Sequence, residues 1–153
     1  MDSKLIRVRL LKSQCNFSRS PVKNSKGQLN VSFSFDMKQN PENNKLFNAQ
    51  FEITIIGKQV DSVDDIFDLN VIMTGEYESK TKPDMGAIKN NKYKYLLPLV
   101  PVVHLHTNDL LTRLDLGAIS IKQDFFYSSL EEGCLLEDTK QPKAKRTTKT
   151  KRQ

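Results

Sequence analysis

The sequence predicts an α+β fold: a four-stranded antiparallel meander sheet, then a long helix, an extended crossover and a short C-terminal helix. Two observations predict it. Before residue 80, four segments alternate apolar and polar side chains, which is the period of a strand with one buried face. After residue 92 comes the longest apolar stretch of the chain, and it contains two prolines, Pro98 and Pro101. With 153 residues, the chain is long enough for one domain with a core.

The four predicted strands occupy residues 4–17, 28–37, 48–57 and 65–79. In the first, Ile6, Val8 and Leu10 share one parity and form its apolar face. In the other three, the apolar side chains fall at every second position: Leu29, Val31, Phe33, Phe35 and Met37; Ala49, Phe51, Ile53 and Ile55; Phe67, Leu69, Val71 and Met73. The connections are modest in length and rich in turn residues, which favours an antiparallel meander over helical crossovers. A single sheet with one apolar face needs a cover.

The prolines predict where the covering helix begins. Proline lacks a backbone donor and fits the first turn of a helix, so Pro101 is expected to begin a helix over residues 101–114, with Pro98 in an extended lead-in. Its apolar positions Val103, Leu110, Leu111 and Leu114 fall near one face. Residues 115–123 show no helical period and are expected to be extended. Residues 124–132 then form a short helix capped by Asp124.

Three local patterns in this order resemble the SecB protein-export chaperone family over residues 4–132. Pro101 to Arg113 matches the family's helix, which has a proline, an amphipathic body and an arginine near its end. Residues 114–122 stand at its Gly-, Pro- and Leu-rich crossover, and "QDFF" at its Asn-Phe-Asp motif, with Phe125 at the aromatic position. "VIMTGEY", residues 71–77, is similar to the Gly-containing stretch and aromatic of the family's fourth strand.

The resemblance implies a cytoplasmic, non-enzymatic holdase that binds unfolded or aggregation-prone polypeptides, or one dedicated protein partner, without ATP or another cofactor. Family members form homotetramers, as dimers of dimers with the long helices between two eight-stranded sheets, and hold clients in apolar grooves. The groove residues implied here are Leu116, Ala118, Ile119, Ile121, Phe125, Phe126 and Leu130. The alternative is that each of them only caps the core.

The chain departs from the family where export chaperones dock the translocase ATPase through acidic residues. The matching positions fall near Ser13 and Ser18 on the first strand and at Asn70 on the fourth, and none is acidic. The resemblance therefore does not support a role in protein transport by export, even if the chain holds clients. Other members of the fold act outside export, for instance as chaperones dedicated to an antitoxin.

The basic charge of the chain is concentrated at its C-terminus. The net charge is +6, and residues 140–153 hold seven of the 24 basic residues and no acidic one. We therefore divide the chain into a SecB-like domain, 1–136, and a disordered basic tail, 137–153, whose cations include Lys143, Lys145, Arg146, Lys149, Lys151 and Arg152. The tail supports an alternative function: a structural or nucleic-acid-associated interaction protein that contacts nucleic acid or another anionic surface weakly through it.

Other kinds of site find no support in the sequence. His104 and His106 are two residues apart on a predicted helix and point in different directions, so we expect no metal site. Cys15 and Cys134 lie far apart without a partner motif, which indicates free thiols in a reducing compartment. No glycine-rich phosphate loop and no catalytic constellation is present, and no apolar run of 18 residues predicts a membrane span.

Overall fold

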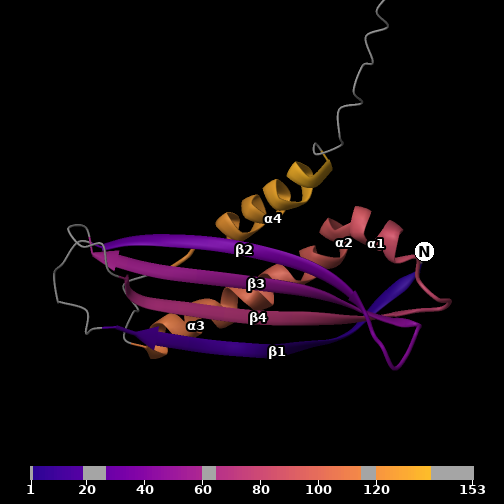
Figure 1. The fold of residues 1–153 in the computed structure, drawn as a ribbon, viewed down its shortest axis with the longest axis horizontal. Coiled ribbons are helices and arrows are strands. Elements are labelled where there is room, and N and C mark those ends of the chain that lie inside the picture. The colour runs from indigo at the N-terminus through magenta and orange to yellow at the C-terminus, as the bar shows by residue number, and fades with distance from the viewer. Residues whose placement is uncertain (1, 19–26, 60–64, 115–119, 139–153) are drawn as a thin grey trace, which may run out of the picture.

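The computed structural model describes residues 2–18, 27–59, 65–114 and 120–138 (Figure 1). Within them, four strands come first and the helices follow. The strands are β1 (Ser3–Phe17), β2 (Gly27–Gln39), β3 (Leu46–Gln59) and β4 (Asp65–Ser79). The helical elements are α1 (Met85–Asn90), α2 (Lys92–Leu96), the 3₁₀ turn η1 (Leu97–Leu99), α3 (Val100–Arg113) and α4 (Gln123–Asp138). The predicted α+β class is confirmed.

The strands form one antiparallel sheet, but their order is β1-β4-β3-β2. The predicted meander therefore holds only from β2 to β4, because β1 lies beside β4 instead of β2. Nine residues connect Phe17 to Gly27. Such a segment can span about 30 Å, whereas three strand spacings need only about 14 Å. A connection of this length fits either strand order, so the sequence could not distinguish them.

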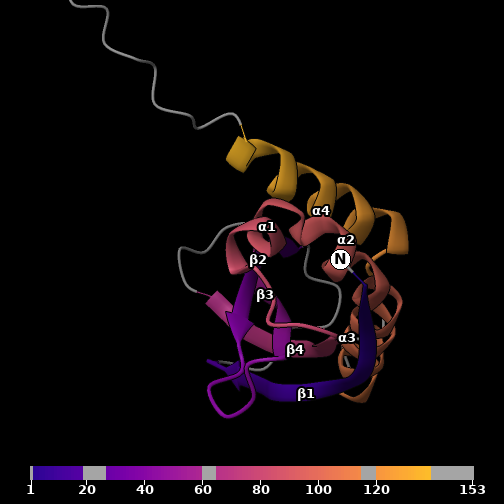
Figure 2. The same ribbon diagram turned by 90° about the vertical axis from the view of Figure 1, so that its right-hand side faces the viewer.

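The core lies between one face of the curved sheet and the helices, which gather on one side of it (Figure 2). In β3 and β4 the predicted alternation is confirmed, and these inward side chains are almost completely buried: Phe47, Ala49, Phe51, Ile53, Ile55, Phe67, Leu69, Val71, Met73 and Tyr77. Burial of a large apolar side chain contributes about 1.5–3 kcal/mol to the free energy of unfolding. The central strand pair therefore anchors the fold.

Two irregularities in β1 change which of its side chains face the core. The register against β4 shifts between Leu5 and Arg7 and again between Leu10 and Lys12. Each shift inserts one extra residue, as a β-bulge does, and moves the inward parity by one. Leu5 and Val8 therefore both pack on the core, while Ile6 is exposed. The predicted apolar face of Ile6, Val8 and Leu10 was wrong at Ile6 for this reason.

The helical cover begins earlier than the sequence predicted. Asp84 caps α1 by accepting a hydrogen bond from the backbone N–H of Gly86 at 2.9 Å, and α2 and η1 continue directly into α3. Pro98 therefore lies in the 3₁₀ turn, and its predicted extended lead-in was wrong. Pro101 does lie in the first turn of α3, as predicted. Both prolines occupy first-turn positions, where a missing N–H removes no intrahelical bond.

Three aromatic rings join this helical cover to the sheet. Phe47, Tyr77 and Tyr95 have ring centroids 5.1 to 5.3 Å apart, and all three are buried. The Tyr77 hydroxyl donates a hydrogen bond to the backbone carbonyl oxygen of Tyr95 at 2.7 Å. Burial, with a smaller contribution from Tyr95, raises the pKa of Tyr77 to about 12.

We predict that Tyr77→Phe alters stability in alkali. Because the folded state raises the pKa of Tyr77, this group contributes stability that is fully present below its ordinary pKa of about 10 and is lost as pH rises towards about 12. The free energy of unfolding in urea should fall less between pH 9 and 11.5 for the variant than for the wild type. Tyr127→Phe is the control, since it leaves Tyr77 in place. Identical alkaline slopes for wild type and Tyr77→Phe would contradict the assignment.

Candidate functional site

The structure separates the predicted groove residues into three groups. Ile121, Phe126 and Leu130 are buried in the core, as the capping alternative requires. Phe125 is 44% exposed. Leu116, Ala118 and Ile119 lie outside the described residues, as do the tail cations. Among the predicted residues that are described, Phe125 is therefore the one with surface left to contact a partner.

Phe125 is the outer member of a cluster of phenylalanines between α4 and β2. The ring of Phe33 on β2 lies 5.7 Å from that of Phe125 and 5.4 Å from that of Phe126, measured between centroids. Below them, Phe51 on β3 packs edge-on against Phe33 at 5.8 Å and against Phe35 at 4.9 Å. Phe125 thus rests on rings that are fixed by the core.

A glycine allows α4 to lie close on β2. A Cβ atom at Gly133 would stand 2.6 Å from a ring carbon of Phe35, which is closer than such atoms pack. The N-terminal end of α4 contacts Phe33 and its later turns contact Phe35, so the helix crosses the inner face of β2. Asp124 had been predicted to cap α4, but it lies within the first turn of the helix. Its carboxylate is still near the positive end of the helix dipole, where a negative charge is stabilising.

A polar clamp on α3 fixes the chain where it enters α4. The side-chain amide of Asn108 donates to the carbonyl oxygen of Ile121 at 2.9 Å and accepts from its N–H at 3.0 Å. His104 Nε2 lies 2.9 Å from that same oxygen and from the Asn108 amide nitrogen, and its ring packs edge-on against Phe126. The clamp therefore positions Ile121, four residues before Phe125.

Leu29 is a second exposed residue on the inner face of β2, and the sequence did not single it out. It is exposed at the start of the strand, while Val31 and Phe33, further along the same face, are partly buried. We call Leu29, Val31, Phe33 and Phe125 the β2–α4 strip. Alternation predicted that Leu29 faces inward, but alternation alone does not reveal how far along the strand the cover extends.

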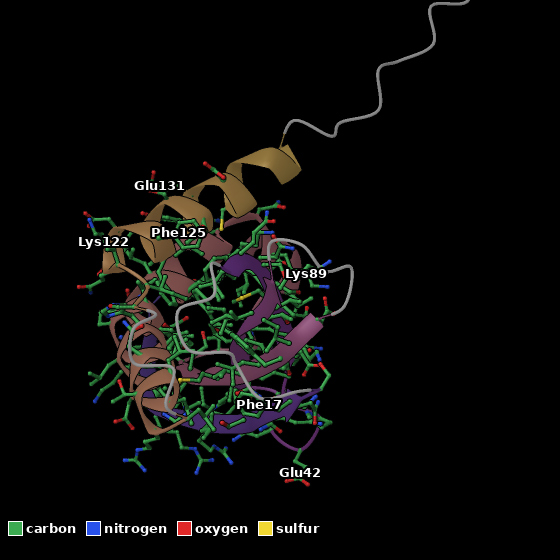
Figure 3. All side chains as sticks on the ribbon, turned by 90° about the vertical axis from the view of Figure 1, so that its left-hand side faces the viewer. Phe17, Glu42, Lys89, Lys122, Phe125 and Glu131 are labelled. Carbon is green, nitrogen blue, oxygen red and sulfur yellow. The ribbon has the colours of Figure 1, made fainter. Side chains whose placement is uncertain are left out.

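Two other apolar surfaces are separate from this strip. On β1 and its bulges, Ile6, Leu10, Leu11 and Phe17 are exposed, and Figure 3 shows Phe17 well apart from Phe125. On α3, Val102 and Leu105 are exposed, away from the buried residues Val103 and Leu111. The sequence could have indicated that Leu105 is exposed, because on a helix it points about 200° away from the buried Val103.

Little in the described residues supports a catalytic site or a metal-binding site. No group of three or more His, Cys, Asp or Glu side chains among them is placed to hold a metal ion. His104 belongs to the clamp, and Cys15 and Cys134 are not joined by a disulfide. In the part of the chain that is described, no helix is both long and apolar enough to cross a membrane.

Comparisons with known proteins bear on the fold. No protein-family model and no curated protein matches the chain. The structure is similar to that of the Mycobacterium tuberculosis SecB-like chaperone Rv1957, solved in complex with a ChAD peptide from the HigA1 antitoxin, Rv1956. The TM-score is 0.65 at 14% identity, over 78% of this chain and 88% of that chain.

The fold is SecB-like. This confirms the predicted fold and says nothing by itself about clients. A protein of unknown function from Streptococcus agalactiae matches with a TM-score of 0.41 at 12% identity, over 80% of this chain and 98% of that chain, which is too weak a likeness to bear on the SecB-like assignment.

We predict that Asn108→Ala releases the start of α4. The variant leaves the N–H of Ile121 without its side-chain partner and removes one of the two side chains that contact its carbonyl oxygen, which should lower the free energy of unfolding by about 1–3 kcal/mol. Thr112→Ala, one turn further along α3 and exposed, is the control and should change stability by less than about 0.5 kcal/mol. Equal losses in urea denaturation would show that the clamp is not what holds Ile121.

Proposed function

We propose that the protein is an ATP-independent chaperone of the holdase type, which binds an unfolded polypeptide or the apolar segment of a dedicated partner. The observation that supports this most directly is Phe125, which is half exposed on a rigid aromatic cluster beside an edge strand with exposed Leu29. The SecB-like neighbour from Mycobacterium tuberculosis was solved with a bound antitoxin peptide, which supports a protein client. The activity proposed is binding, without catalysis or a cofactor.

The β2–α4 strip suits a client of low sequence specificity. Burial of apolar area is non-directional, so any extended segment with suitably spaced apolar side chains can bind. Each client side chain buried there contributes on the order of 1.5–3 kcal/mol, and several weak contacts add up along the strip. The crossover residues Leu116, Ala118 and Ile119, which lie outside the described residues, stay part of the proposed binding surface on the resemblance alone.

The proposal does not extend to protein export. The positions where the export family has docking acids hold Ser13, Ser18 and Asn70. Asn70 donates its side-chain amide to Glu52 Oε1 at 2.8 Å and to the Thr54 hydroxyl at 3.0 Å, within the sheet surface. We therefore propose a holding role in a reducing cytoplasm, which the lack of a disulfide between Cys15 and Cys134 favours, with a general or a dedicated client.

We also propose that the chain assembles as a homo-oligomer, a dimer of dimers. The exposed Val102 and Leu105 on α3 support this, because in a helix packed between two sheets both faces are apolar. The basic residues after 139 are proposed to add weak, salt-dependent contacts to anionic surfaces, outside the client-binding strip.

We predict that replacing Phe125 and Leu29 together by serine weakens client binding at least tenfold, since both side chains lose their apolar contact with the client. The measurement is calorimetric titration with a permanently unfolded apolar polypeptide at moderate salt. The wild type should bind with a negative heat-capacity change, as apolar burial requires.

Two controls make this test specific. Phe17→Ser removes an aromatic ring with the same exposed fraction, 44%, from β1, the opposite edge strand of the sheet, and should leave the affinity unchanged. Truncation after Asp138 removes the basic residues and should also preserve binding. Equal weakening by Phe17→Ser would refute the proposed site, and loss of binding on truncation would favour the tail-based alternative.

A further inference from the structure

The face of the sheet opposite the helices has a basic row on its edge strand. The register places Arg7, Arg9 and Lys12 of β1 opposite Glu76, Thr74 and Ile72 of β4, on the face away from the core. All three basic residues are exposed. The helices of the described chain cover the other face (Figure 2), so this row is open to a partner.

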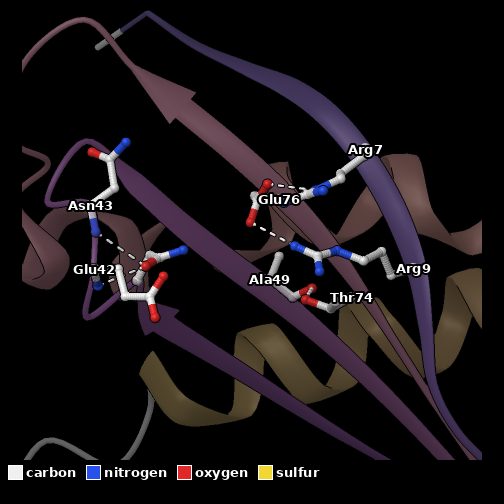
Figure 4. Close-up of polar contacts among 8 residues, drawn as sticks. Arg7, Arg9, Glu42, Asn43, Ala49, Thr74 and Glu76 are labelled. Atoms are coloured by element: carbon white, nitrogen blue, oxygen red, sulfur yellow. Dashed lines mark hydrogen bonds and ion pairs between the residues drawn. The ribbon is translucent and has the colours of Figure 1, made fainter.

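A buried carboxylate holds two of these cations in place. Arg7 Nε donates to Glu76 Oε1 at 2.7 Å, and Arg9 Nη2 donates to Oε2 at 3.0 Å (Figure 4). The Glu76 side chain is only 2% exposed, whereas those of Arg7 and Arg9 are 54% and 48% exposed. The hydrogen bond from Arg7 and the two positive charges lower the pKa of Glu76, although its burial acts in the opposite direction. The carboxylate therefore stays ionised and orients both guanidinium groups.

The arginines retain binding capacity beyond Glu76. A guanidinium group has five N–H donors, and Glu76 accepts one from each arginine. Glu76 offsets one of the three positive charges in the row. Glu52 lies on β3, two strands away from β1, and accepts a hydrogen bond from Asn70. Lys4, the next outward cation, lies opposite Glu78 and is left out of the row. The row keeps a net positive charge with outward-facing donors.

The surroundings of the row favour a peptide over a nucleic acid. Ile6 and Leu11, beside the row at the two bulges, are exposed aliphatic residues that suit apolar side chains. The outward positions of the four strands, as described, hold no aromatic side chain on which a base could stack. Arg7 and Arg9 are two residues apart on a strand, about 7 Å, which is the spacing of carboxylates at alternate positions of an extended peptide.

We propose that the basic row of Arg7, Arg9 and Lys12 docks an extended acidic segment of a protein partner, with carboxylates at alternate positions and aliphatic residues between them. The segment would lie on the outward face of β1, so this docking is compatible with the dimer of dimers proposed above. This docking surface is distinct from the β2–α4 strip. It gives the protein a means of recognising one partner by charge while the strip binds clients by apolar contact.

The test uses a fluorescein-labelled ten-residue peptide of alternating glutamate and valine, titrated with the full chain at about 0.15 M salt, where exposed long-range charge is largely screened. Arg7→Gln/Arg9→Gln should bind it at least tenfold more weakly than the wild type. Lys82→Gln/Lys89→Gln removes two exposed charges away from the row and should bind like the wild type. A glutamine–valine peptide should bind at least tenfold more weakly than the acidic one.

Three results would overturn the proposal: equal weakening by the two double variants, equal affinity for both peptides, or displacement of the acidic peptide by a single-stranded oligonucleotide at lower concentration than by unlabelled peptide. Because Arg7→Gln/Arg9→Gln leaves Glu76 buried without a counter-charge, two further variants are measured. Arg7→Gln/Arg9→Gln/Glu76→Gln removes the whole cluster and should fold yet not bind. Arg7→Lys/Arg9→Lys keeps the charge without the planar fork and should bind with intermediate affinity.

Discussion

The burial of one face of a four-stranded sheet is the constraint on which the rest of this structure depends. β3 and β4 present an unbroken apolar surface, and a single sheet cannot remove such a surface from water by itself. The helical elements α1 to α3, which follow one another along the chain, cover part of this surface. The helix α4 covers another part and packs on β2 through Phe33, Phe126 and the close approach at Gly133. Where that cover ends, Leu29 and Phe125 remain exposed.

The sequence predicted the elements whose signal is local. Period-two alternation located three strands well, and the proline rule placed the start of α3 within a residue. Two features were beyond such rules. The place of β1 beside β4 depends on a connection whose length permits either order, and the bulges in β1 arise from its pairing, which a single strand does not reveal. No helix was predicted for residues 85–96, where α1 and α2 lie, and Pro98 was expected in an extended lead-in instead of a 3₁₀ turn.

The candidate site was predictable as a segment but not residue by residue. Phe125 and Phe126 are adjacent and chemically identical, yet one is exposed and the other is buried against Phe33 and His104. The helix phase set by the Asn108 clamp and by Gly133 decides between them, and both are tertiary contacts. The outward charges on β1 also needed the register of the sheet before Arg7 and Arg9 could be placed around Glu76.

We propose that the two faces of one sheet serve different kinds of recognition. On the inner side, at the edge of the cover, contact is apolar and tolerant of sequence; on the outer side, charge and hydrogen-bond geometry select the partner. The central claim is that clients bind along the β2–α4 strip. Hydrogen exchange with and without an unfolded apolar polypeptide tests it most directly. If clients bind along the strip, exchange in residues 27–33 and 120–130 slows when client is bound. Protection confined to β1 and α3, with those two segments unchanged, would contradict it.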